Sequence, residues 1–158
     1  TRDLHHACEE HPVGAAMAPG NPPLGWYADW LYAIHRIHHV VDPAIPENLR
    51  RVAALETDIV NSGVISTPVP SAYAYAESLN TDDKIAGAAY VLTGAHLMGG
   101  EIMRRRLKGY PTEHLEWDDR PAAIAALRVF RERVELADEA RACFSALLSI
   151  MDDILERA

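Results

Sequence analysis

Histidine is the residue type in this sequence with the clearest capacity for chemistry. The chain has 158 residues and holds eight histidines, which fall into three groups along the sequence. The groups are His5, His6 and His11, then His35, His38 and His39, and then His96 and His114. An imidazole titrates near neutral pH, moves protons and ligates metal ions. These groups are the first candidates for a functional site.

A pair of adjacent glycines, Gly99-Gly100, is the second unusual feature. It lies in the stretch TGAHLMGGEIMR, whose flanks KIAGAAYVL and RRRL have helical periodicity. Each interior glycine costs a helix about 0.8–1 kcal/mol relative to alanine. The pair has three interpretations: close packing on a neighbouring helix, a kink without a ligand, or close approach of backbone to a flat ligand. The spacing alone leaves all three open.

The elements that position these residues are predicted to be helices throughout, because no alternating strand pattern competes with the helical period. Capping residues at Asn80-Thr81-Asp82-Asp83 and at Asp119 mark two helix starts. We see no repeat and no linker, so the sequence predicts one all-α domain over residues 1–158. The expected helices are 2–18, 24–41, 46–62, 72–79, 82–107, 121–136 and a last one ending near 157.

Composition and charge exclude some classes of protein. Hydrophobic residues make up 49%, which argues against disorder. Fifteen basic and 23 acidic residues give a net charge of −8, so a nucleic-acid surface is not expected. No apolar run approaches the roughly 20 residues of a membrane span. The two cysteines, Cys8 and Cys143, are too few for a disulfide framework, and we expect a cytoplasmic protein.

Four segments, taken in order, resemble the heme oxygenase family. Tyr90, Ala95, His96 and Gly99-Gly100 resemble its kinked distal helix, whose backbone crosses the heme face. The other three segments resemble the family's first helix with its iron-binding histidine, its aromatic second helix and its last helix. They are Leu4 to Glu9 followed by Pro12, Tyr27 to Leu31 continuing to Asp42-Pro43, and Glu139-Ala140 to Phe144.

The resemblance implies a heme oxygenase-like helical bundle with a kinked distal helix. It also implies an enzyme that opens heme b, its cofactor and substrate, to biliverdin, CO and ferrous iron. The reaction needs O₂ and an external electron donor such as ferredoxin or a reductase. His5 is the implied iron ligand, with Glu9 on the same helix face to fix its tautomer. The other implied heme contacts are Tyr90, Ala95, Gly99, Gly100 and Phe144, with Arg128 and Arg131 for the propionates.

Two positions depart from the family pattern. His96 stands where the family commonly has an Asp that orders proton-delivering water, and His38 stands where it often has a Tyr. Both positions hold histidine in this chain, which suggests that the two departures from the pattern are coupled. His96 and His38, with Gly99 and Gly100, are therefore the candidate catalytic residues. An imidazole at position 96 has three possible roles: to order water, to ligate the iron, or only to satisfy its own hydrogen bonds.

Two other classes of function remain open from the sequence. A non-heme iron or di-iron enzyme has enough donors available: His35, His38, His39, Asp42, Glu9, His96 and Glu101. A heme carrier or sensor would place His5 and His96 together on the iron. The basic run Arg104-Arg105-Arg106 with Lys108 is either a solvated face or a docking surface for an acidic electron donor.

Overall fold

Helices make up the regular structure of the protein. The computed structural model describes residues 2–157, and the elements in that range contain no strand. The all-α prediction is therefore confirmed. The α-helices are α1 Arg2–Glu10, α2 Pro12–Met17, α3 Leu24–Val41, α4 Val52–Ser62, α5 Pro70–Ser78, α6 Asp82–Gly94, α7 Gly100–Arg106, α8 Arg120–Arg131 and α9 Ala137–Glu156. Shorter turns are η1 Asp42–Ala44, η2 Glu47–Leu49, η3 Ala95–Gly99, η4 Glu113–Leu115 and η5 Val134–Leu136.

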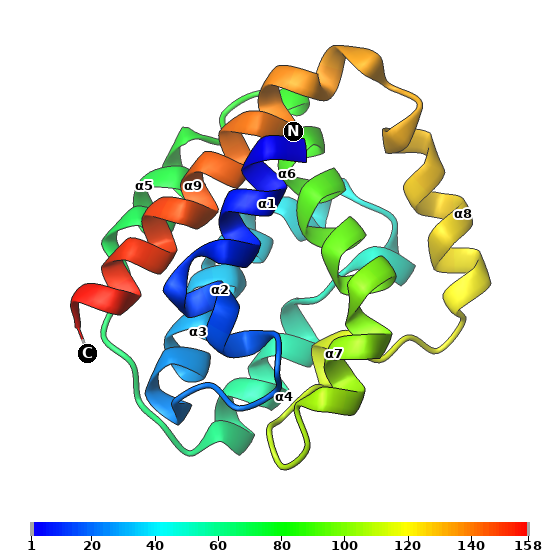
Figure 1. Ribbon diagram of the computed structural model, residues 1–158. Helices are drawn as coiled ribbons and strands as arrows, with labels where there is room; N and C mark the ends of the chain where they lie inside the picture. Colours follow the sequence, from blue (N-terminus) through cyan, green and yellow to red (C-terminus); the bar gives the residue numbers. More distant parts are fainter. Residues whose placement is uncertain (1, 158) are drawn as a thin grey trace.

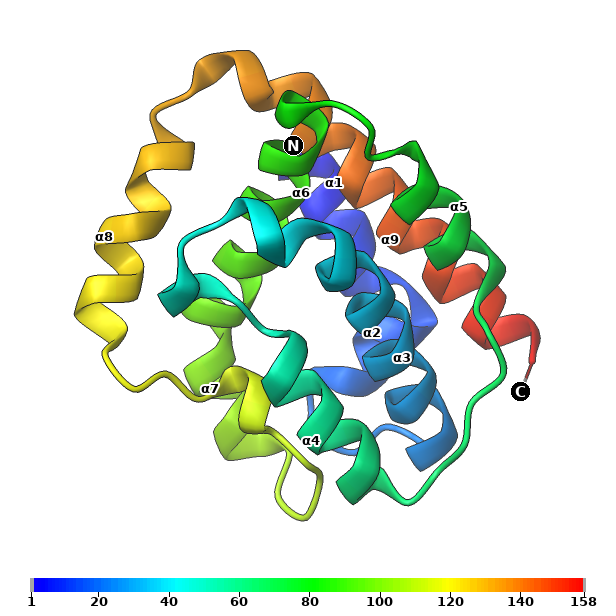
Figure 2. The ribbon, with the colours of Figure 1, turned by 180° about the vertical axis from the view of Figure 1, so that it is seen from behind.

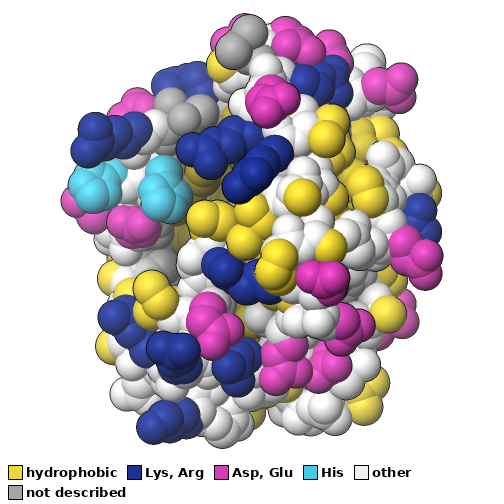
Figure 3. Space-filling view, turned by 90° about the vertical axis from the view of Figure 1, so that its right-hand side faces the viewer, with side chains coloured by type: hydrophobic (Ala, Val, Ile, Leu, Met, Phe, Trp, Pro, Cys, Tyr) yellow, Lys and Arg dark blue, Asp and Glu magenta, His cyan; other side chains and the backbone are white. Residues whose placement is uncertain are grey.

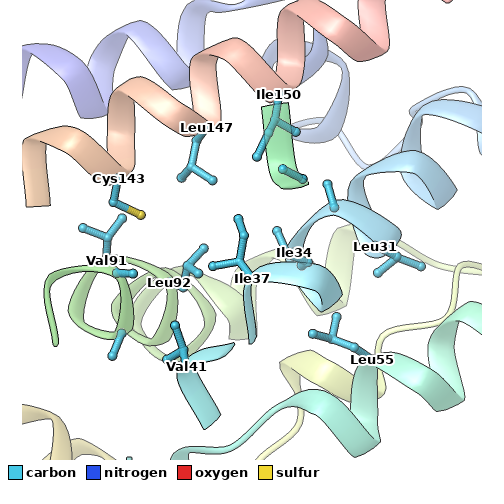
Figure 4. Close-up of a cluster of buried hydrophobic side chains, with 14 of the residues drawn as sticks. Leu31, Ile34, Ile37, Val41, Leu55, Val91, Leu92, Cys143, Leu147 and Ile150 are labelled. Carbon is cyan, nitrogen blue, oxygen red and sulfur yellow. The ribbon is translucent and has the colours of Figure 1, made fainter. Parts of the chain in front are cut away.

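The core is built around α3, α6 and α9. Figure 4 shows aliphatic side chains of these helices meeting at the centre, including Ile34 and Ile37 of α3, Leu92 of α6 and Ile150 of α9. Burying one such side chain contributes about 1.5–3 kcal/mol to folding. α5 lies beside α9, and α4 packs on the other side of α3 (Figures 1 and 2). Together these contacts fix α3 and α6, the two elements that carry His38 and lead into His96.

The prediction of one helix over residues 2–18 is wrong, because the chain divides at His11. Pro12 takes the first position of α2, where the missing backbone N–H is not needed. The Nδ1 atom of His11 accepts a hydrogen bond from the Val13 backbone N–H at 3.1 Å and so caps α2. A side chain at Gly14 would overlap the Cys8 carbonyl oxygen, so glycine is required at this close turn.

Two other predicted boundaries are also wrong. The helix expected over 46–62 begins only at Val52, because the Asp42 carboxylate accepts from the Arg51 and Val52 backbone N–H groups at 2.9 and 2.8 Å. The helix expected over 121–136 ends at Arg131, and residues 134–136 form a separate turn. The predicted caps at Thr81 and Asp119 are confirmed, since both side chains accept backbone N–H bonds.

The helix expected over 82–107 is interrupted at the place that the glycines indicated. Residues Ala95–Gly99 form a π-helical turn, η3, between α6 and α7. Figure 1 shows the helix axis changing direction between α6 and α7. Such turns insert an extra residue into a helix and are a known cause of kinks. The predicted kink is therefore confirmed. Across the described residues, no helix is both long enough and apolar enough to cross a membrane.

Candidate functional site

The histidines of α1 lie at the protein surface. His5 Nε2 and Glu9 Oε1 are 3.4 Å apart, and His6 Nδ1 lies 3.4 Å from the other oxygen of the same carboxylate. His5 also packs the edge of its ring on Phe144 of α9, with centroids 5.8 Å apart. The predicted neighbours His5, Glu9 and Phe144 are thus brought together. In this orientation of the ring, Glu9 faces Nε2, so Nδ1 of His5 is the nitrogen left for a ligand.

The two glycines of the kinked helix have different surroundings. A Cβ added at Gly99 would meet no atom within 4 Å, whereas one at Gly100 would lie 3.4 Å from Leu115 Cδ2. Gly100 is therefore turned toward the protein and Gly99 toward open space. The closest helix packing belongs to a different glycine, Gly87, where a side chain would overlap Glu139 of α9. Helix packing accordingly accounts for Gly87 and does not account for Gly99.

Exposed apolar residues lie on the kinked helix near Gly99 and on the neighbouring helix α8. Ala95 is exposed, and so are the large side chains of Met98 (59% exposed) and Ile102 (54%), with Val129 of α8 also exposed. On the face that carries α8, Figure 3 shows apolar side chains gathered beside basic and histidine side chains. Isolated exposed apolar residues need no explanation, but a contiguous set on one face indicates a binding surface.

The other residues predicted to contact heme differ in how far they are exposed to solvent. Arg128 and Arg131 are exposed on α8, and neither forms an ion pair with another residue in the range 2–157. Their cations are therefore available to an anionic group. Tyr90 is half-buried and packs against the hydrophobic core. α1 packs chiefly on α2 and α9.

Three buried imidazoles meet beneath the π-helical turn. His38 of α3, His96 of η3 and His114 of η4 are 0%, 6% and 3% exposed. The His96 ring stacks on that of His38 at 5.5 Å, 26° from parallel, and meets His114 edge-on at 5.4 Å. The two histidines predicted as catalytic candidates, at positions 38 and 96, are therefore in direct contact. The third, His114, was grouped with His96 in the sequence but was not among the predicted site residues, and it is part of the same cluster.

Each outer imidazole is held by a buried carboxylate. His38 Nδ1 donates to Asp42 Oδ1 at 2.8 Å, and His114 Nδ1 donates to Asp58 Oδ2 at 2.6 Å. Asp58 also accepts the backbone N–H groups of Glu113 and His114, at 2.8 and 2.9 Å. A carboxylate at Nδ1 fixes the proton on that nitrogen and leaves Nε2 as an acceptor.

His96 has no such carboxylate. Its Nδ1 is buried without a hydrogen-bond partner among the described residues, and so is Nε2 of His38. Burial lowers the pKa of His96 well below its ordinary value, and His114, His38 and Arg51 add to that effect. Burial also lowers the pKa of His38, although Asp42 opposes it. Both imidazoles are therefore neutral at pH 7, and their unpaired nitrogens are suited to bind buried water.

Side chains from other elements hold the π-helical turn in place. Trp117 Nε1 donates to the His96 carbonyl at 3.3 Å, and Arg120 donates to the Leu97 carbonyl at 3.2 Å. The Arg51 guanidinium lies 3.6 Å from the centre of the Trp117 ring, a cation–π contact. A π turn breaks the regular bonding of its carbonyl groups, and these donors compensate for that loss.

The donors proposed for a dinuclear metal centre are not assembled. Within residues 2–157, no group of three or more His, Cys, Asp or Glu side chains is arranged to hold a metal ion. Glu101 instead pairs with Arg104 and Arg105, at 3.1 and 3.4 Å. His35 lies 3.2 Å from Glu56. The side chains considered as metal ligands thus belong to separate ion pairs and to the imidazole cluster.

Known structures share this arrangement of helices. No protein-family model and no curated protein sequence matches the chain. A heme oxygenase from Leptospira interrogans superposes with a TM-score of 0.80 at 17% identity, over 94% of this chain and 93% of that one. Heme oxygenase-1 from the cyanobacterium Synechocystis, solved in complex with heme, gives 0.78 at 14% identity, over 99% and 87%. The protein has a heme oxygenase-like fold.

Proposed function

We propose that the protein is a heme oxygenase, which cleaves heme b to biliverdin, CO and ferrous iron with O₂ and external electrons. The observation that carries the proposal is the open space over Gly99 on an exposed apolar face, in a chain with a heme oxygenase-like fold. Heme, when bound, supplies the redox-active iron and is itself the molecule that is oxidised.

His5 is the residue that we propose to hold the iron. Its ring is exposed, packs on Phe144 and has Glu9 beside it. A carboxylate next to an imidazole orients the ring and makes its free nitrogen a stronger donor. His6 shares Glu9 but has no ring contact of this kind in the described structure. His5 is therefore the better anchored of the two candidates.

The face around Gly99 is proposed to cover the other side of the heme. Ala95 and Gly99 expose backbone without bulky side chains, while Gly100 keeps the turn close to Leu115. Tyr90 lies on the preceding turns of α6. Arg128 and Arg131 are exposed and form no ion pair with another described residue, as suits cations that bind propionates. These residues fit a flat, largely apolar ligand with an anionic edge.

The imidazole cluster is proposed to hold water and protons on the Gly99 side. Because His38 Nδ1–H is committed to Asp42, its Nε2 accepts. A water between this atom and the unpaired His96 Nδ1 would satisfy both. His114, fixed by Asp58, supports the other side of the His96 ring. A neutral imidazole in this position orders water, because it has one donor and one acceptor nitrogen.

The carrier or sensor alternative requires His96 to ligate the iron. Its ring lies between His38 and His114 and is 6% exposed, so ligation would require the ring to leave that stack. The same ring contacts favour a role for His96 in ordering water over a role as an iron ligand. The non-heme metal alternative lacks an assembled donor set among residues 2–157. We therefore favour the oxygenase.

The electron donor is proposed to be a separate protein, such as ferredoxin or a reductase. The basic run on α7 offers a docking surface, although Arg104 and Arg105 share Glu101 and Arg106 donates to the Ala18 carbonyl. Lys108 is exposed. Both cysteines are free thiols, buried at positions 8 and 143, which fits our proposal of a cytoplasmic location.

Addition of hemin and ascorbate to the purified protein under air tests the proposed function. We expect saturation at one hemin per chain, followed by loss of the Soret band and appearance of biliverdin in the extracted product. Catalase is included so that peroxide does not bleach the heme. Stable ferrous heme under these conditions would support the carrier or sensor instead, and no saturable Soret shift would exclude both heme functions.

A further inference from the structure

A second concave region lies away from the imidazole cluster, between α3, the connector before α5, and α5 itself. This groove has a volume of about 400 Å³ and shares no lining residue with the candidate heme site. Pockets for small ligands have volumes of roughly 300–1,000 Å³. The floor consists of Ala33 and Val69, both 2% exposed. The groove is therefore large enough and apolar enough for a small organic molecule.

The charge of the groove is opposite to that of the chain. Acidic residues outnumber basic ones by 23 to 15, yet no carboxylate lines the groove. Arg36, His35 and His39 do line it. Two carboxylates contact lining residues from outside the groove, and neither pairs with Arg36: Glu56 lies 3.2 Å from His35, and Asp29 is held by the Ser66 hydroxyl and by Arg157 at 3.6 Å.

Arg36 has no anionic partner among the described residues. Its Nε atom is buried and makes no hydrogen bond within residues 2–157. The guanidinium carbon lies 4.9 Å from the centre of the Tyr73 ring, which orients the side chain. A buried donor without a partner destabilises the folded state, and such a group in a folded protein often marks the place of an ion or a water molecule.

We propose that this groove binds a small planar organic carboxylate. The carboxylate accepts hydrogen bonds from the Arg36 guanidinium, whose planar shape matches it. The flat apolar part of the ligand lies on Ala33 and Val69, beside Tyr73. A simple phosphate fits less well, because the floor is apolar. The first turn of α5 is also already occupied: the Ser71 backbone N–H donates to Asp153 at 2.9 Å.

Titration of the heme-free protein, followed by amide NMR shifts, tests this proposal independently of heme chemistry. The probes are sodium benzoate, its uncharged analogue benzamide, and inorganic phosphate. We expect saturable benzoate shifts in α3 and α5, with benzamide about tenfold weaker because it cannot form the ion pair. Arg36→Gln should weaken benzoate by about the same factor. Arg105→Gln, an exposed arginine of α7, is the matched control and should change nothing.

Several results would overturn the proposal. Benzamide that binds as tightly as benzoate would show that Arg36 pairs with no carboxylate. Phosphate that binds more tightly than benzoate at the same residues would define an inorganic anion site. Benzoate shifts confined to Arg128 and Arg131 would place the site elsewhere. If Arg36→Gln does not fold, Tyr73→Leu is the second variant, because the Tyr73 side chain is exposed. It should weaken benzoate binding roughly threefold, because it removes the ring beside Arg36. An unchanged benzoate affinity in Tyr73→Leu would refute the site.

Discussion

The rings of His38 and His96 stack at 5.5 Å, although they come from helices that are far apart in the sequence. His38 belongs to α3 and His96 to the π-helical turn, so the contact ties the kink to the second long helix. The resemblance to the heme oxygenase family implied tyrosine and aspartate at these two positions. The structure shows that the two replacements are neighbours and that His114 completes the cluster. A change at either position therefore alters the surroundings of the other ring.

The first prediction concerns the two adjacent histidines of α1. His5→Ala should abolish the native Soret band and the ferric spin signature, because we propose that this imidazole holds the iron. His6→Ala is the matched control: it shares Glu9 but lacks the ring contact with Phe144, and it should retain both signals. Absorption spectra of the hemin-loaded variants check this. A loss of signal in His6→Ala alone would move the proposed ligand by one position.

The second prediction separates the roles of the two glycines. Gly99→Leu should fold with unchanged or slightly higher stability, because its Cβ meets nothing within 4 Å and leucine favours helices by roughly 0.5–1 kcal/mol. The same variant should bind hemin about tenfold or more weakly, since the side chain occupies the proposed heme face. Gly100→Ala, which faces Leu115, should keep its hemin affinity. Thermal melts measure the stability of each variant, and hemin titrations measure its affinity for hemin. A Gly99→Leu variant that binds hemin as tightly as the native protein would contradict the proposed heme face.

The third prediction concerns stability and pH in the heme-free protein. The folded pKa values of His96 and His38 lie below that of an unfolded histidine, near 6.5. The unfolded chain therefore binds more protons below that pH, so the free energy of unfolding falls as the pH drops from about 7 to 5. Each histidine contributes a slope of up to about 1.4 kcal/mol per pH unit.

Urea unfolding of the native protein and of His96→Gln measures this slope. The variant lacks one of the two titrating groups and should show a smaller change in unfolding free energy over the same range of pH. His39→Gln, an exposed histidine on the same helix as His38, is the control and should retain the native slope. Identical slopes in all three proteins would show that His96 does not titrate as its burial implies.

The fourth prediction concerns the carboxylate beneath His114. Asp58→Asn should lower the free energy of unfolding by about 2 kcal/mol, because the buried carboxylate accepts three N–H bonds. Asp152→Asn is the control: this carboxylate lies 2.8 Å from His11 Nε2 but is mostly exposed, and its loss should cost at most about 0.5 kcal/mol. Equal losses in both variants, measured by urea unfolding, would argue against Asp58 as a structural anchor.

Local contacts could be predicted from the sequence, and distant ones could not. A separation of four residues on a helix predicted that Glu9 lies beside His5. The same rule also predicts that Asp42 lies beside His38. No local signal joins Asp58 to His114, which lie 56 residues apart. The π-helical turn was predicted only as a kink at the glycines, because its geometry depends on donors supplied by Trp117 and Arg120. The break at Pro12 was missed, although proline at a first helical position is a known signal.

The ferric spin state of the hemin complex at low pH tests the central claim most directly. If His5 holds the iron and His96 only orders water, the native protein should be mainly high-spin with water at the sixth position. His96→Ala should remain high-spin and bind hemin almost as well, while it forms biliverdin more slowly. A six-coordinate low-spin complex that His96→Ala converts to high-spin would show that His96 ligates the iron. That result would contradict the oxygenase account and identify a heme carrier or sensor.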